Sequence, residues 1–81
     1  MNNVLIECVP NISEGRDLDI INSIVDSARE IEGVKVLGCE PDSDYNRTVI
    51  TIAGDQVSVT KGAHAIIINS LDLIDMIRHS G

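Results

Sequence analysis

A run of seven residues near the middle of the chain, RTVITIA at 47–53, constrains the fold most, because nearly every position holds a β-branched side chain. Branched side chains fit the pleated surface of a strand better than a helix. Val34–Cys39 (VKVLGC) predicts a second strand, and a turn rich in Pro, Asp and Ser at Glu40–Asp44 connects the two. So short a connection predicts an antiparallel hairpin.

The segment before this hairpin predicts one strand and one helix. Asn3–Val9 (NVLIECV) is rich in branched residues, and we expect Pro10 to end the strand. Leu18–Glu32 has apolar residues at helical spacing, with Asp17 as its N-cap and Gly33 as its C-terminal stop.

A second helix is predicted after the hairpin, from about Gln56 to Ile77. We expect one side of it to carry Val59, Ala63, Ile66, Ile67, Ser70, Ile74 and Ile77. The triple isoleucine at 66–68 and Gly62 both disfavour helix, so a strand is the competing interpretation.

The resulting order, β-α-β-β-α, is the split βαβ pattern of ferredoxin-like α/β (α+β) folds without its final strand. We expect a single incomplete domain, 1–81, in which Asn3–Val9 and Arg47–Ala53 are parallel central neighbours. Both faces of the first strand are mostly apolar. Helices cover only one face of such a sheet, so the other face and the strand's exposed edge should need a partner layer.

Size and composition exclude several classes of protein. At 81 residues the chain forms one small domain that buries about 60–65% of its unfolded surface. A formal charge of −7, one Tyr and no Phe or Trp argue against nucleic-acid binding. The longest apolar run, Ala65–Ile68, is too short for a membrane span. No signal peptide is visible, which favours the cytoplasm. Cys8 and Cys39 match no CxxC motif, and we expect two buried thiols there rather than a disulfide.

Two polar clusters are candidates for chemistry. The hairpin turn has Glu40, Asp42 and Asp44 beside Arg47, at the end of the sheet where we also expect the second helix to end with Arg78–Gly81. Such a cluster could hold a cationic or amide ligand or position a general base. Turn propensity alone also explains these acids.

The second cluster is the loop NISEGR, which we expect at the opposite end of the sheet. Gly15, Arg16 and the following helix N-terminus could hold an anion. Alternatively, the loop's Asn and Ser form local turns and Glu14 is exposed. A metal site has little support, because His64 has no His or Cys three or four positions away.

Three stretches resemble one family, in the right order and over essentially the whole chain. LIECVPNISEGRD resembles the start of the formiminotransferase N-terminal subdomain (glutamate formimidoyltransferase), which begins ECVPN-(F/I)-SEGR. DSDYNRTVITIAG is similar to the family pattern D-x-D-H-N-R-(S/T)-V-x-T-x-x-G, with Tyr45 in place of the usual His. LIDMIRHSG resembles the ending L-I-D-M-x-x-H-x-G.

The resemblance implies two similar α/β subdomains whose sheets pack face to face around a folate-binding groove. It implies transfer of the formimino group from N-formimino-glutamate to the co-substrate tetrahydrofolate in histidine breakdown, and a C-terminal subdomain or homodimer partner. By resemblance, Glu40 is an acid that assists the transfer. The positions that match the family's substrate-binding motifs are Asn11, Ser13, Glu14, Asp44, Asn46, Arg47, Arg78 and His79.

One departure from the family pattern bears on activity. The histidine thought to act as general base is the second His of R-H-x-G-E-H-P-R, which would be the second residue beyond Gly81. We therefore expect the isolated chain not to catalyse the transfer. The alternative is a small, non-catalytic ferredoxin-like module for binding or oligomerisation, which sedimentation as a tight homodimer without folate affinity would favour.

Overall fold

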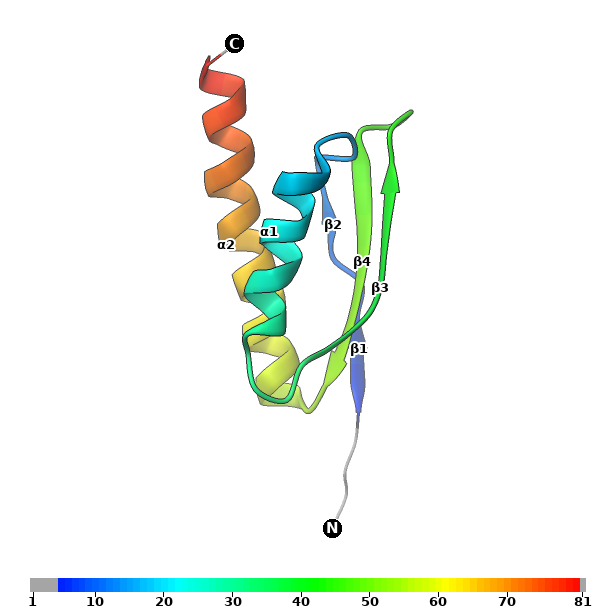
Figure 1. Cartoon of the computed structure of the whole chain (residues 1–81). Coiled ribbons are helices and arrows are strands. Elements are labelled where there is room, and N and C mark those ends of the chain that lie inside the picture. The colour runs from blue at the N-terminus through cyan, green and yellow to red at the C-terminus, as the bar shows by residue number, and fades with distance from the viewer. Residues whose placement is uncertain (1–4, 81) are drawn as a thin grey trace.

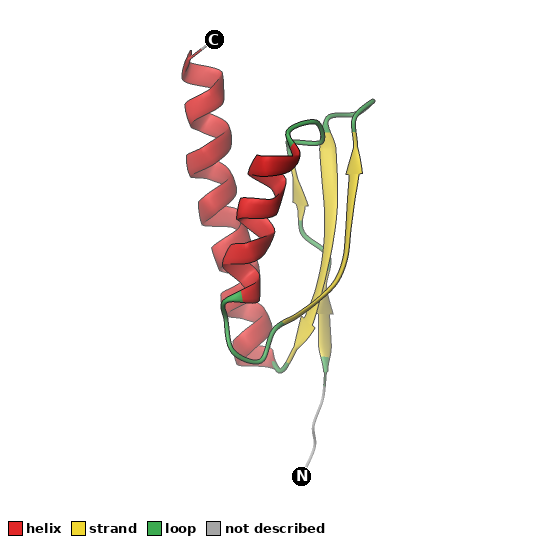
Figure 2. Ribbon diagram, viewed as in Figure 1, coloured by secondary structure: helices red, strands yellow, loops and turns green. Residues whose placement is uncertain are grey.

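The computed structural model describes residues 5–80, with side chains up to Leu73. Its elements are β1 (Ile6–Cys8), β2 (Asn11–Ile12), α1 (Leu18–Arg29), β3 (Lys35–Asp42), β4 (Arg47–Gly54) and α2 (Gln56–Ser80). Both helices pack on one face of a four-stranded sheet, and no described element covers the other face (Figure 1). Figure 2 shows the same two layers by secondary structure. The predicted α/β class with a split βαβ arrangement is confirmed.

β4 is the central strand, and every described pairing in the sheet is antiparallel to it. β1 and β2 pair with one edge of β4, and β3 pairs with the other. The expectation that the first strand runs parallel to the RTVITIA strand is wrong. The crossover through α1 makes β1 parallel to β3, and β4 is inserted between them in the opposite direction.

The two prolines affect the sheet differently. β1 ends at Cys8, before Pro10 as predicted, and pairing with β4 resumes beyond Pro10 as β2, whereas Pro41 lies within β3. β1 and β2 pair with β4 in one register, and the Pro10 carbonyl accepts a hydrogen bond from Ile50 N at 3.0 Å. Proline lacks only the donor half of such a pair. Ile12, expected in a loop, is therefore buried in the sheet. Pro41 is tolerated because β3 is an edge strand, so the predicted turn shrinks to residues 43–46.

α1 begins as predicted and ends earlier. The Asp17 carboxylate accepts hydrogen bonds from Asp19 N at 3.1 Å and from Ile20 N at 3.3 Å, which makes it the N-cap. The helix ends at Arg29, three residues before the expected end, and Gly33 adopts φ +91° in the turn that leads to β3. Only glycine reaches that conformation without strain.

α2 is a helix throughout, so the strand interpretation of its isoleucine run is wrong. Val59 and Ile66 are buried against the sheet and α1 as expected, whereas Ile67 is 51% exposed. The core-facing stripe passes beside Ile67 because α2 is held against both α1 and β4. The side chains of Ile74 and Ile77 lie outside the described residues. Neither helix, over its described part, is long and apolar enough to cross a membrane.

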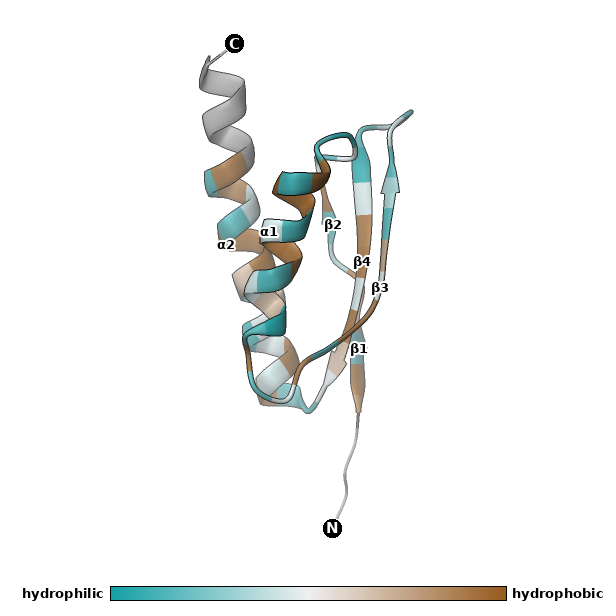
Figure 3. Cartoon of the chain, viewed as in Figure 1, coloured by the Kyte–Doolittle hydropathy of each residue, from teal (hydrophilic) through white to brown (hydrophobic). Residues whose placement is uncertain are grey.

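The core lies between the two helices and one face of the sheet. Apolar residues line the side of α1 that faces the strands (Figure 3). The buried cluster consists almost entirely of branched aliphatic side chains: Ile12, Ile21, Ile24, Val25, Ala28, Ile50, Ile52, Val59 and Ile66. Interdigitated side chains of this shape explain how the chain forms a core without Phe or Trp.

The opposite face of the sheet, which we call the open face, is bare. Alternate residues of the strands point to it, and Leu5, Val9 and Leu37 are 75%, 51% and 56% exposed. The expectation that one apolar face lacks cover is confirmed for the described residues.

Cys8 and Cys39 are free and flank β4 on the covered face. Two strand spacings, about 10 Å, separate their strands, which is too far for a disulfide. Burial raises the pKa of the Cys39 thiol. The positive charge of nearby Arg29 lowers this pKa, but by less than burial raises it. Both cysteines are therefore packing residues in this fold.

Candidate functional site

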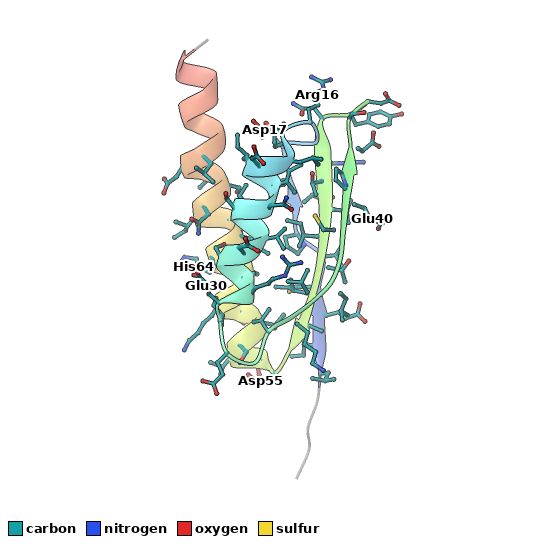
Figure 4. All side chains as sticks on the ribbon, in the orientation of Figure 1. Arg16, Asp17, Glu30, Glu40, Asp55 and His64 are labelled. Atoms are coloured by element: carbon teal, nitrogen blue, oxygen red, sulfur yellow. The ribbon has the colours of Figure 1, made fainter. Side chains whose placement is uncertain are left out.

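The loop before α1 and the hairpin turn lie side by side at one end of the sheet. Gly15 N donates a hydrogen bond to Asn46 Oδ1 at 3.0 Å, and Arg16 Nε donates one to Ser43 O at 2.9 Å. Figure 4 shows Arg16 and Asp17 at this end of the molecule. The expectation that the two clusters lie at opposite ends is wrong, because β1 is antiparallel to β4 and therefore ends where β4 begins.

Close backbone contact joins the loop to the hairpin. A Cβ at Gly15 would lie 2.5 Å from Arg47 N and 2.7 Å from Arg47 O, so only glycine fits. The buried Thr48 hydroxyl donates a hydrogen bond to the carbonyl of Glu14. Asn46 adopts φ +51°, a left-handed conformation that Asn tolerates better than most residues.

The Glu14 side chain is buried and serves the loop itself. Its Oε2 accepts hydrogen bonds from Arg16 N at 3.1 Å and from Asp17 N at 3.0 Å. The alternative that Glu14 is exposed is wrong. Because the Asp17 carboxylate accepts hydrogen bonds from the amides of Asp19 and Ile20, the chain's own carboxylates already occupy this helix N-terminus. The loop is therefore a poor place for an external anion.

Asn11 and Glu40 lie in one row on the open face. Both pair with Val49, from opposite sides of β4, and both side chains are exposed. Asn11 Nδ2 donates a long hydrogen bond of 3.4 Å to Val9 O. Figure 4 shows Glu40 pointing away from the helices. The row thus presents an amide and a carboxylate to whatever covers the sheet.

Arg47 belongs to the same face, two residues before Val49 on β4. Its guanidinium carbon lies 6.0 Å from the centre of the Tyr45 ring, within the range of a cation–π contact. The Tyr45 side chain is 77% exposed at the tip of the turn. Asp42 Oδ1 accepts hydrogen bonds from Asp44 N at 3.0 Å and from Tyr45 N at 3.3 Å, so this acid shapes the turn.

The remaining predicted site residues are dispersed. Ser13 and Asp44 are exposed in the loop and the turn. Arg78 and His79 fall on the last turns of α2, which ends at the same end of the molecule as the hairpin turn (Figure 1), but their side chains lie outside the described residues. Among the described residues no three His, Cys, Asp or Glu side chains gather as metal ligands, and His64 is exposed on α2.

Of the predicted residues, the structure brings Asn11, Glu40 and Arg47 together on the open face and assigns Glu14 and Asn46 to internal contacts. Sequence reasoning missed the contact of Tyr45 with Arg47. The available signal was that Tyr45, the only aromatic residue of the chain, stands in a turn.

These observations define a class of domain. It is a split βαβ layer whose sheet is uncovered on one face, with polar side chains at one end of that face. Comparison with known proteins is more specific. The family model described as "Formiminotransferase domain, N-terminal subdomain" matches residues 5–81, and the chain belongs to this family.

Its similar relatives carry matching names. The glutamate formimidoyltransferase of Thermoplasma acidophilum is 44% identical over 77 residues, 95% of this chain and 25% of that protein. That of Streptococcus pyogenes is 36% identical over 95% of this chain and 26% of the relative. The formimidoyltransferase-cyclodeaminase of Dictyostelium discoideum is 43% identical over 98% of this chain and 15% of the relative. The chain thus spans about a quarter, or less, of these relatives' length.

Proposed function

We propose that this chain forms one wall of a site that transfers the formimino group of N-formimino-glutamate to tetrahydrofolate. The observation that carries the proposal is the arrangement of Asn11, Glu40 and Arg47 on the bare face of a domain of this family. The full length of the relatives supports a second wall contributed by further residues. Cytoplasmic histidine breakdown is the proposed setting.

Each of the three side chains suits one part of this chemistry. The exposed carboxylate of Glu40 can accept hydrogen bonds from the nitrogen-bound protons of a formimino group and can hold a proton. The Arg47 guanidinium suits a substrate carboxylate, which it can bind with two parallel hydrogen bonds. Asn11 offers both donors and an acceptor for orienting a bound ring or amide. Tetrahydrofolate, when bound, supplies the attacking amine.

We further propose that the isolated chain does not catalyse the transfer. Positioning two substrates supplies much of the rate of a two-substrate transfer, and general acid–base catalysis adds about 10²–10⁴-fold. A single wall does neither well, because the side chains of Asn11, Glu40 and Arg47 are exposed to water. Turnover of N-formimino-glutamate with tetrahydrofolate by purified 1–81, followed spectrophotometrically, would contradict this part of the proposal.

A chimaera tests the roles of the individual residues. Residues 5–81 replace the matching segment of the Thermoplasma acidophilum relative, and transfer is measured. We expect Glu40→Gln to lower kcat by about 10²-fold or more and Arg47→Lys to raise the KM for N-formimino-glutamate about 10-fold. Glu30→Gln, which alters an exposed carboxylate at the end of α1, is the matched control (Figure 4). Equal kcat values for Glu40→Gln and Glu30→Gln would show that Glu40 does not take part in the transfer.

A further inference from the structure

We propose that Tyr45 is a positioning residue, whose ring holds the Arg47 guanidinium in place to bind a carboxylate of the substrate. This role rests on the proposed function, because it concerns how N-formimino-glutamate is held. The hairpin tip has three features that support it. They are a turn with a fixed backbone, an arginine that forms no ion pair with its neighbours among the described residues, and a ring beneath that arginine.

The backbone on either side of the tyrosine is fixed. Asp42 Oδ1 accepts hydrogen bonds from Asp44 N at 3.0 Å and from Tyr45 N at 3.3 Å. Asn46, the next residue, adopts φ +51°, and its Oδ1 accepts a hydrogen bond from Gly15 N at 3.0 Å. The turn is therefore tied both to itself and to the loop before α1. The ring starts from a backbone position that is constant relative to β4.

Arg47 keeps its hydrogen-bond donors. The residue directly across the hairpin is Asp42, and opposite charges at such positions ordinarily pair. The Asp42 carboxylate is instead engaged with amides of the turn. Among the described residues, the arginine side chains that donate hydrogen bonds or form salt bridges are those of Arg16 and Arg29. Arg16 ties the loop to the turn by donating to Ser43 O, so it is already committed.

The contact that Arg47 does make is with the aromatic ring. Its guanidinium carbon lies over the Tyr45 ring, 6.0 Å from the ring centre. The negative face of the ring attracts the cation, and this contact consumes none of the five N–H donors of the guanidinium. A salt bridge would take up both donors and charge. The ring thus holds the cation and leaves its donors to a ligand.

The free donors suit a carboxylate. A guanidinium binds a carboxylate through two parallel hydrogen bonds, which require one orientation of its plane. Because Arg47 is exposed, its long side chain would otherwise adopt many rotamers, and ordering them on binding would lower affinity. Tyr45 reduces this loss by ordering the guanidinium beforehand. We therefore expect it to act on substrate binding and not on the reacting atoms.

The chimaera with the Thermoplasma acidophilum relative also tests this role. We expect Tyr45→Ala to raise the KM for N-formimino-glutamate about 3- to 5-fold, with kcat unchanged to within about 2-fold. Tyr45→Phe keeps the ring face and should keep the wild-type KM to within about 2-fold. Ser43→Ala, exposed at the same tip, is the matched control and should change neither constant.

A double-mutant cycle shows whether the tyrosine acts through the arginine. In the Arg47→Met background, Tyr45→Ala should raise the KM by less than about 2-fold, because the cation that the ring holds is already absent. Three results would overturn the positioning role: a loss of kcat with an unchanged KM, an equal defect in Tyr45→Phe, or the same effect of Tyr45→Ala with and without the Arg47 guanidinium.

A binding measurement separates failure of this role from failure of the transfer. N-acetyl-glutamate has the carboxylates but no formimino group, so its Kd for the chimaera reports carboxylate binding without turnover. A Kd that Tyr45→Ala raises in a chimaera without transfer activity supports the positioning role and contradicts the proposed function. An unchanged Kd in a chimaera that does transfer contradicts the positioning role alone.

NMR of the 81-residue chain tests the contact itself and needs no chimaera. The ring should shift the δ-methylene protons of Arg47 upfield, since they belong to the side chain that lies over its face. Tyr45→Ala should abolish this shift, and Tyr45→Phe should keep it. Identical Arg47 shifts in the wild type and in Tyr45→Ala would overturn the proposal.

Discussion

β4 builds two different surfaces from alternate residues. Thr48, Ile50 and Ile52 point to the helices and have no exposed surface. Val49 and Thr51, between them, point to the open face and remain half-buried. The first set holds the domain together, and the second lies among the side chains that we propose for chemistry. The difference shows that a sheet covered on one side separates stability from function along a single strand.

Truncation of a side chain on the covered face should cost the most. Ile52→Ala should lower the free energy of unfolding by about 2–5 kcal/mol, because it leaves a cavity in the core. Val49→Ala, three positions earlier on the other face, should cost less than about 1 kcal/mol. Urea denaturation followed by circular dichroism measures both.

If Ile52→Ala unfolds this small domain altogether, Ile52→Val serves instead. Its expected cost is about 0.5–1.5 kcal/mol. Equal costs at Ile52 and Val49 would contradict the division of β4 into two surfaces.

A substitution where the loop meets the hairpin should rank next. Gly15→Ala places a Cβ 2.5 Å from Arg47 N, so backbone must shift, at a cost of about 1–3 kcal/mol. Gly38→Ala is the matched control on the open face, where the nearest atom to the new Cβ is Thr51 Oγ1 at 4.0 Å. It should be neutral or stabilising by up to about 1 kcal/mol. Urea denaturation midpoints measure both variants, and equal midpoints would contradict the close contact at Gly15.

Asn46 separates the contribution of a hydrogen bond from that of a backbone conformation at the same end of the sheet. Asn46→Gly should lose about 1 kcal/mol, because it loses only the bond from Gly15 N. Asn46→Ala should lose about 1–2 kcal/mol more, because alanine is strained at φ +51°. Thermal or urea unfolding of the pair gives the difference directly, and a Gly variant less stable than the Ala variant would contradict this assignment.

The weakest of these effects concerns the cap of α2 and depends on pH. Hydrogen bonds from Ser58, N–H at 2.8 Å and hydroxyl at 2.9 Å, lower the pKa of Asp55. Because the folded pKa lies below the unfolded one, the stabilisation is present above the unfolded pKa and is lost as pH falls through the folded pKa. The stability gap between wild type and Asp55→Asn should therefore shrink as the pH falls below the ordinary pKa of an aspartate, 3.8. Urea midpoints across this range measure it, and a constant gap would contradict the cap.

Local patterns predicted most of the elements. Branched residues indicated the hairpin strands, helical spacing indicated both helices, and Asp17 was correctly identified as a cap. The errors concerned prolines and directions. β1 ends before Pro10 as predicted, but pairing with β4 resumes beyond it as β2. Pro41 lies within the edge strand β3, where the sheet does not need its missing donor.

The candidate site was predicted only in part, because its members come from separate strands. Glu40 and Arg47 were recognisable as polar residues next to a turn, but nothing local indicated that Asn11 joins their face. Nor could local pattern separate Glu14, which is buried under its own loop, from an exposed acid.

Side-chain periodicity along the chain was enough to assign the strands and helices and to show that one sheet face stays apolar and bare. The antiparallel direction of β4 against β1 and the meeting of the α1 loop with the hairpin turn emerged from the three-dimensional arrangement alone. An alternating pattern is the same whichever way a strand runs, so strand direction and strand neighbours follow from the handed crossover through α1 and from helix packing.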